Sequence, residues 1–149
     1  MPVQKDKIKA PRWQLFTDGA SKGNPGPAGA GWVLVSDQNT DPIREGKYLG
    51  LATNNEAEYQ ALIFGLQRAL ACDVQEIRIS MDSELLVRQL NGLYRVKNPR
   101  LALLFHQVQD LLLKFSNYDI IHVPREHNRE ADRMANEAIK KGATGGNKP

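Results

Sequence analysis

The order of hydrophobic patterns along this chain is the feature that most restricts its fold. Three strand-like segments follow one another directly, and only after them do helical and strand-like segments alternate. Successive strands favour an antiparallel meander, whereas strands separated by helices are typical of parallel additions to a sheet. We therefore expect a mixed five-stranded α/β sheet with helices packed on it. The expected strands are 12–20, 30–37, 43–50, 75–81 and 118–123, and the expected helices are 54–71, 83–92, 99–115 and 128–141.

Two turns are expected between the first three strands. One is the Gly- and Pro-rich segment SKGNPGPAG at 21–29, and the other is a short turn near Asn39. The first segment matches neither the P-loop nor the dinucleotide fingerprint, and a strand rather than a helix follows it. Two interpretations therefore fit this segment: its backbone approaches a ligand closely, or it is an ordinary loop.

Length and composition indicate one domain, 12–141, with flexible tails at 1–11 and 142–149. A hydrophobic content of 41% and a charged content of 25% in 149 residues are ordinary for a soluble globular protein. No apolar stretch reaches membrane-spanning length, and the N-terminus lacks the apolar segment of a signal peptide. Cys72 is the single cysteine, which excludes an intramolecular disulfide and fits a reducing compartment. We expect a cytoplasmic protein with no membrane partner.

The net charge of +3 comes from the two ends of the chain. Residues 13–139 carry 13 basic and 16 acidic side chains, so the body of the chain is slightly acidic. The informative feature is local, because the segment between Leu85 and Gln109 holds basic residues and no acidic one. Such a stripe fits contact with nucleic-acid phosphates and an ordinary solvated face equally well. We call it the basic segment, and its members are Arg88, Arg95, Lys97 and Arg100.

Four acidic residues stand where an acidic residue is locally a poor choice. Asp18 and Asp82 each end an apolar strand-like run. Glu58 and Asp132 each lie on the apolar stripe of an expected helix, the face that should be turned to the core. Helices packed on a sheet can bring such positions together at one edge. Clustered carboxylates repel one another unless they take up protons or bind hard divalent cations. The sequence therefore predicts a metal-dependent enzyme.

Each of these acids also has a structural explanation. Asp18 suits a turn, and Asp82 suits the N-cap of the helix that follows it. Glu58 and Asp132 suit the positive end of a helix dipole. The metal-site interpretation depends on all four positions together, since a structural explanation is sufficient for each residue alone.

Three histidines are candidates for proton transfer. His106 lies in an expected helix and His122 in an expected strand, and both positions favour structural roles. His127 lies in the segment PREHN, just before the helix of Asp132, where a histidine beside a metal carboxylate can move protons near neutral pH. An exposed loop histidine without a catalytic role fits this position equally well. No Cys/His cluster indicates zinc.

Five motifs, in this order and spacing, resemble type 1 ribonuclease H over residues 13–141. They are FTDGASKGNPGPAG, TNNEAEYQAL, MDSELLVRQLNG, YRVKN and NREADRMAN. The resemblance implies a ribonuclease H-like fold, with sheet order 3-2-1-4-5 and helices on both faces. It also implies hydrolysis of the RNA strand of an RNA–DNA hybrid duplex by a two-metal-ion mechanism, leaving 5′-phosphate and 3′-hydroxyl ends. The implied cofactors are two Mg²⁺ ions per site, with Mn²⁺ as a substitute.

The resemblance further implies roles for individual residues. The four acids described above match the metal-binding carboxylates of the family. The implied substrate-binding residues are Asn24, Asn54 and Asn55 for the minor groove, Thr53 and Asn98 for a DNA-strand phosphate, and Arg95 and Lys97 in the basic segment.

The chain departs from the family pattern in three places. Many members insert a basic, Trp-rich protrusion where NGLYRVKNPRL here passes directly into the next helix, as in compact members. This difference predicts weaker unaided hybrid binding, partly compensated by the basic segment and the basic N-terminal tail. The loop before Asp132 is short, so Arg125 or Glu126 can occupy the place of the usual loop histidine instead of His127. Glu84 stands where some members carry Gln, and its charge weakens contact with a nucleic-acid backbone.

Other functions fit parts of the pattern. An inactive or weak hybrid-binding module has the same fold, although clustered acids facing phosphates do not help a pure binder. A related nuclease, including one that cuts double-stranded RNA, and the nuclease domain of a reverse transcriptase have similar architectures. The asparagine positions and the GNPG turn favour the hybrid-specific enzyme. We expect a monomer without an obligate protein partner.

Overall fold

The computed structural model describes residues 7–38 and 41–144. The expected turn near Asn39 and the outer parts of both expected tails, residues 1–6 and 145–149, lie outside the described residues. Within the described part, none of the helices is long and apolar enough to cross a membrane.

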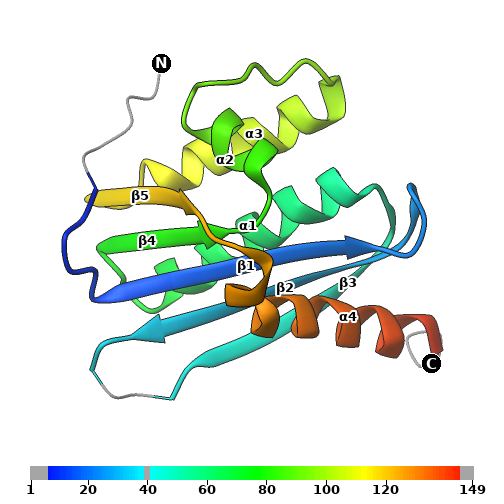
Figure 1. Cartoon of the computed structure of the whole chain (residues 1–149), viewed down its shortest axis with the longest axis horizontal. Helices are drawn as coiled ribbons and strands as arrows, with labels where there is room; N and C mark the ends of the chain where they lie inside the picture. Colours follow the sequence, from blue (N-terminus) through cyan, green and yellow to red (C-terminus); the bar gives the residue numbers. More distant parts are fainter. Residues whose placement is uncertain (1–6, 39–40, 145–149) are drawn as a thin grey trace.

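Five strands form one mixed sheet at the centre of the molecule (Figure 1). They are β1 (Trp13–Ser21), β2 (Gly26–Ser36), β3 (Ile43–Ala52), β4 (Glu76–Met81) and β5 (Asn117–His122). Strand β2 pairs antiparallel with β1 and β3, while β4 pairs parallel with β1 and β5. The order β3-β2-β1-β4-β5 confirms the expected topology. Because β1 lies in the middle, its C-terminal end is beside the end of β4.

Helices cover both faces of the sheet, as expected. In the described ranges they are α1 (Asn54–Ala71), α2 (Glu84–Leu90), α3 (Pro99–Leu112), the short 3-10 turn η1 (Arg125–His127) and α4 (Arg129–Thr144). Figure 1 shows α4 on one face and α1 on the other, and α3 packs on α1. The largest part of the core lies between the sheet and α1, with the fully buried side chains Leu15, Leu62, Leu66, Ile77 and Ile79.

The observed boundaries differ from the expected ones in several places, for local reasons. Strand β2 begins at Gly26, inside the expected turn, because its first residues already pair with the end of β3. Helix α3 ends at Leu112, since the N–H of Phe115 donates to the carbonyl of Leu112 in the tight geometry that closes a helix. Helix α4 continues to Thr144, and η1 precedes it where a loop was expected.

Glycines let both covering helices lie directly on the backbone of the sheet. A side chain at Gly19 of β1 would overlap the backbone of Ala57 in α1. In the same way, a side chain at Gly31 of β2 would overlap the carbonyl of Ala131 in α4. Neither overlap can be relieved by a flexible side chain, because backbone atoms lie in the way. Acidic residues next to these contacts are thereby brought close to the end of β1.

The inner part of the N-terminal segment is attached to the far edge of the sheet. Ile8 is buried, and its backbone N–H donates to Oδ2 of Asp119 in β5 at 2.8 Å. The Arg78 guanidinium of β4 donates to the Ile8 carbonyl at 2.6 Å and pairs with the Asp119 carboxylate at 3.0 Å. This part of the segment expected to be a flexible tail therefore packs on the sheet.

Candidate active site

Three carboxylates converge where β1 and β4 end and α1 begins. Among the described residues, Asp18, Glu58 and Asp82 each offer an oxygen that lies within 4.8 Å of the other two. Asp18 is near the end of β1, Asp82 directly follows β4, and Glu58 lies in the second turn of α1. The structure therefore brings together three of the four acids that the sequence analysis singled out.

Neither Asp18 nor Asp82 has the structural role that the sequence also allowed. Asp18 lies inside β1, paired with Gly31, and not in a turn. The N-cap of α2 is Ser83, whose hydroxyl accepts from the N–H of Leu86 at 3.3 Å. Because Ser83 caps the helix, the Asp82 carboxylate is left to face the other two acids.

Backbone contact holds Glu58 in the group. The N–H of Gly19 donates to Oε1 of Glu58 at 3.1 Å. This hydrogen bond depends on the close packing of α1 on β1, which the missing side chain of Gly19 allows. The strand that carries Asp18 therefore also orients the carboxylate of Glu58.

The charges of this group are poorly compensated by the protein itself. Burial raises the pKa of Asp18 far above its ordinary value, and repulsion from Glu58 and Asp82 raises it further. Burial also raises the pKa of Glu58, as does repulsion from Asp82. The Gly19 N–H and, more weakly, the Arg125 guanidinium oppose this increase in the pKa of Glu58. Carboxylate oxygens are ligands that hard divalent cations prefer, so the donor set fits such a cation.

Asp132 was expected on the buried stripe of its helix, and this expectation is wrong. The buried stripe of α4 lies one position away, because small side chains there fit against the glycines of the sheet. Asp132 itself is exposed. It still acts on Asp18, since it is among the groups that raise the pKa of that carboxyl, after burial and the other two acids. Asp132 therefore borders the group from the solvent side. The buried residues of α4 are Ala131, Ala135, Ala138 and Ile139.

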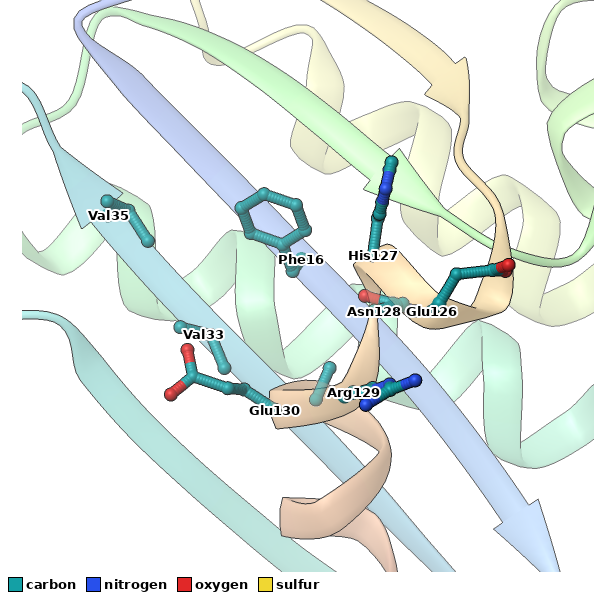
Figure 2. Close-up of a pocket in the computed structure, with 9 residues that line it drawn as sticks. Phe16, Val33, Val35, Glu126, His127, Asn128, Arg129 and Glu130 are labelled. Carbon is teal, nitrogen blue, oxygen red and sulfur yellow. The ribbon is translucent and has the colours of Figure 1, made fainter.

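The structure places Arg125 rather than His127 beside Asp132. Figure 2 shows His127 at an apolar hollow of about 190 Å³, which is lined also by Phe16 and two valines of β2. A neighbouring hollow, which shares Glu126 and Arg129 with the first, is lined by Asp132 and Arg125 but not by His127. Of the three histidines, His106 and His122 are exposed on α3 and at the end of β5. A catalytic role for His127 stays a prediction from the sequence.

Most of the expected substrate-binding residues line one hollow of about 420 Å³ beside the start of α1. The Asn54 N–H donates to Oδ1 of Asn24 at 3.0 Å, and Oδ1 of Asn54 accepts from the N–H of Ser21 at 3.0 Å. Oδ1 of Asn98 caps α3, and the hydroxyl of Thr53 caps α1. The lining residues are Asn24, Thr53, Asn54, Asn55, Glu56, Asn98, Arg100 and Leu101.

The four members of the basic segment differ in their partners and surroundings. Arg88 pairs with Glu84 at 2.7 Å, and Arg100 pairs with Glu56 at 3.3 Å. Arg95 lines a different, more apolar hollow with Tyr94 and Phe105. Lys97 is exposed. Of the four basic residues, Arg100 alone lines the hollow that holds the asparagines.

Two asparagines that contact the acids were not predicted from the sequence. Nδ2 of Asn128 donates to Oδ2 of Asp82 at 2.9 Å, and Nδ2 of Asn136 donates to Oδ1 of Asp132 at 3.2 Å. In the sequence, an asparagine before a helix resembles an ordinary cap, and one within a helix resembles a surface residue. Only the spacing of four between Asp132 and Asn136 could have indicated a contact.

Comparison with known proteins assigns the chain to a family. Residues 16–138 match the family model described as Reverse transcriptase-like. The chain is 43% identical over 128 residues to the Ribonuclease HI of Halobacterium salinarum, which covers 86% of this chain and 64% of that protein. The chain thus spans less than two thirds of the length of this relative, and 35% of the length of other curated relatives.

Solved structures give the same assignment over their whole length. RNase H1 from the halophilic archaeon Halobacterium salinarum superposes with a TM-score of 0.84 at 42% identity, covering 87% of this chain and 98% of that chain. LC11-RNase H1, solved in complex with an RNA/DNA hybrid, superposes with a TM-score of 0.83 at 38% identity, covering 89% and 99%. The chain therefore belongs to the type 1 ribonuclease H group of the reverse transcriptase-like family.

Proposed function

We propose that this chain is a metal-dependent endoribonuclease that hydrolyses the RNA strand of RNA–DNA hybrids and leaves 5′-phosphate and 3′-hydroxyl ends. The observation that carries this proposal is the group of three carboxylates from Asp18, Glu58 and Asp82 within 4.8 Å of one another. The relatives support the choice of substrate, because one is named Ribonuclease HI and another was solved with an RNA/DNA hybrid.

Asp18, Glu58 and Asp82 would hold two Mg²⁺ ions, or Mn²⁺ in their place, and Asp132 would contribute from the solvent side. When bound, such ions lower the pKa of the attacking water and stabilise the charge on the leaving oxygen. The chain itself keeps like charges together at the junction of β1, β4 and α1. Burial of Asp18 and the hydrogen bonds that Glu58 and Asp82 accept restrict the carboxylates, so that little reorganisation is needed when a cation binds.

The asparagines beside the start of α1 are suited to hold the hybrid. Oδ1 of Asn24, of Asn54 and of Asn98 already accepts hydrogen bonds from backbone N–H groups. Their remaining amide N–H groups are therefore the ones offered to the solvent side. Phosphate oxygens and 2′-hydroxyl oxygens are acceptors, so this arrangement fits contact with a hybrid minor groove. Asn55 and Thr53 line the same hollow.

Arg100 would supply the positive charge of this hollow. Its side chain is 81% exposed and pairs with the largely buried Glu56 at 3.3 Å, so solvent reaches the guanidinium and weakens the pair. A DNA-strand phosphate can therefore compete with Glu56 for the guanidinium. Lys97 and Arg95 would contact phosphates outside the hollow, which makes the affinity for hybrid fall with added salt.

Arg125 would take the place of the usual loop histidine. It lines the hollow that contains Asp132, and its charge lowers the pKa of Glu58 against the larger effect of burial. A guanidinium stays protonated at neutral pH, so it cannot exchange protons as an imidazole does. Its contribution would be to stabilise negative charge at the phosphate that is cut.

Cleavage of four labelled duplexes of one sequence tests the proposal. They are RNA–DNA, RNA–RNA, DNA–DNA, and DNA with a single ribonucleotide, each incubated with Mg²⁺, with Mn²⁺ and with chelator. We expect cutting of the RNA strand in the hybrid only when metal is present. Cutting of RNA–RNA at a similar rate would favour a broader nuclease, and binding without cutting in every metal would favour an inactive hybrid-binding module.

Asp82→Asn distinguishes catalysis from binding. The substitution keeps the shape of the side chain but removes a charged metal ligand. We expect cleavage of the hybrid to be lost and hybrid binding to be kept, with a melting temperature no lower than that of the parent protein, because Asp82 repels both Asp18 and Glu58. Unchanged turnover would exclude the assigned site. Monomeric state and cytoplasmic location stay predictions from the sequence.

A further inference from the structure

A buried asparagine connects the segments that carry three of the acids. Asn128 is 1% exposed and lies between η1 and α4. Its Nδ2 donates to the carbonyl of Thr17 and to Oδ2 of Asp82, both at 2.9 Å. Its backbone carbonyl accepts from the N–H of Asp132 at 3.1 Å. Asn128 therefore contacts the residue before Asp18, the side chain of Asp82 and the backbone of Asp132.

The amide of Asn128 has one orientation that satisfies these contacts. Both partners of Nδ2 are oxygen acceptors, so a flipped amide would place its own oxygen against two others. Thr17 is the last residue of β1 paired with β4, opposite Met81. Asn128 thus spans the two strands at the point where their pairing ends. Figure 2 shows it on the loop directly before α4, close to β1.

The other end of the same amide is left unsatisfied. Oδ1 of Asn128 is buried and has no hydrogen-bond partner among the described residues. A buried acceptor without a partner is unfavourable, and an apolar side chain at this position would avoid it. The two hydrogen bonds donated by Nδ2 are therefore the interactions of this side chain that offset the cost of the unpaired oxygen.

We propose that Asn128 is a positioning residue, which fixes the Asp82 carboxylate for binding of a divalent cation. This inference rests on the proposed function for the identity of the ligand. A neutral amide orients one carboxylate oxygen and leaves the other to a cation, without adding charge. Lysine or arginine here would repel the cation, and a carboxylate would repel Asp82. Groups that hold metal ligands by hydrogen bonds typically change metal affinity or activity by about 10–100-fold when removed.

Binding of Mn²⁺ to the free protein tests this inference without substrate. Calorimetric titration of Asn128→Ala should show an affinity for Mn²⁺ about tenfold or more below that of the parent protein. Cleavage of the hybrid at a fixed metal concentration should lose kcat by a similar factor, with KM for the hybrid unchanged within about twofold. An unchanged affinity for Mn²⁺ in a folded Asn128→Ala protein would overturn the inference.

Asn91→Ala is the matched control for lost stability. Nδ2 of Asn91 also donates to a strand carbonyl, that of Ile120 at 3.2 Å, but Asn91 is on α2's C-terminal side and contacts β5. Both variants should melt at lower temperature, and only Asn128→Ala should lose affinity for Mn²⁺. An equal loss of affinity in both variants would show that Asn128 acts only through general stability.

A double-mutant cycle shows whether Asn128 acts through Asp82. In a protein that already carries Asp82→Asn, the further change Asn128→Ala should not reduce the affinity for Mn²⁺ again, whereas additive losses would contradict the inference. If Asn128→Ala does not fold, Asn128→Ser replaces it in the same titrations, with the same direction of change expected. A protein that binds Mn²⁺ in this way but cuts no hybrid would refute the proposed function and leave the role of Asn128 standing.

Discussion

Asp18 and Glu58 are surrounded in a way that disfavours their negative charges. Burial is the main cause, and the neighbouring acids add to it. At each of these residues, the folded protein therefore holds a proton more strongly than the unfolded chain does. The same surroundings favour a divalent cation, which neutralises several carboxylates at once. Stability, pH and metal binding are coupled at these two side chains.

Stability without metal should fall as the pH rises. Because the pKa values of Asp18 and Glu58 are raised on folding, the folded state binds more protons than the unfolded state from about pH 4 upward. In chelator, we expect the melting temperature to decrease from that pH toward neutral pH, and saturating Mg²⁺ should reverse most of the decrease. Asp18→Asn should raise the melting temperature in chelator by a few degrees and flatten the pH profile. Asp110→Asn, at an exposed carboxylate of α3, is the control and should leave both unchanged.

Arg125 and His127 should differ in their effect on turnover. Arg125 lines the hollow of Asp132, whereas His127 lines the apolar hollow of Figure 2. We expect Arg125→Ala to lower kcat on the hybrid by roughly tenfold or more, in keeping with the loss of a charged group that stabilises a transition state. His127→Ala should retain activity within about twofold. The reverse result, measured under single-turnover conditions, would return the catalytic role to the histidine.

At the scale of elements, the site depends on two helices that each touch the backbone of the sheet at a glycine. Helix α1 rests on β1 at Gly19, and α4 rests on β2 at Gly31. A capping box formed by Thr53 and Glu56 fixes where α1 begins. The position where α1 begins and its close contact with β1 at Gly19 together determine how far Glu58 reaches toward β1.

Gly19→Ala should open the group of carboxylates. The added methyl would overlap backbone atoms of α1, so the helix must move away from β1. We expect a loss of about 1–3 kcal/mol in the free energy of unfolding, as for other overpacked sites, and a loss of affinity for Mn²⁺. Gly50→Ala is the control, because its added methyl meets no atom within 4 Å and only its φ of 73° is unfavourable. If both variants bind Mn²⁺ like the parent protein, the close contact of α1 with β1 at Gly19 does not position Glu58.

The sequence predicts the elements better than it predicts their contacts. Strand and helix patterns locate nine of the elements, and Asp18 and Asp82 at the strand ends are recognisable because an acid interrupts an apolar run. The strand order came from the resemblance to a family. The face of Asp132 was predicted wrongly, because the buried stripe of α4 consists of Ile139 and three alanines, which pack against glycines far away in the sequence. Contacts of this kind, including that of Asn128, follow from tertiary packing and leave no local pattern.

At the scale of the whole molecule, the C-terminal ends of the central strands and the starts of β4 and β5 carry different kinds of charged group. The ends of β1 and β4 carry the acids that repel one another. Nearer the start of β4 and β5, the paired residues Arg78 and Asp119 neutralise each other and hold the backbone of Ile8. The Asp119 side chain is fully buried, and the Arg78 guanidinium and the Ile8 N–H replace the water that it loses on folding. Stability and chemistry are therefore separated along the strands.

Asp119→Ala should reduce stability without reducing turnover. It leaves the largely buried Arg78 guanidinium without its carboxylate and frees the N–H of Ile8. Removing one partner of a buried pair costs about 3–5 kcal/mol, so we expect a large decrease in melting temperature. Below that temperature, kcat on the hybrid should match the parent protein. Glu130→Ala, which removes a half-exposed ion pair with Arg44, is the control and should cost less than about 1 kcal/mol. A lower kcat in folded Asp119→Ala would show that this edge is coupled to the site.

The close contact of α4 with Gly31 also makes the helix a suitable place for a fluorescent label. Because the backbone of α4 contacts the backbone of β2 at Gly31, we expect the helix to move together with that strand. A fluorophore attached in place of the exposed Glu137, on the outer surface of α4, would therefore report the orientation of the sheet itself. Its anisotropy would follow the tumbling of the whole protein, and thus the size of any complex that the protein forms.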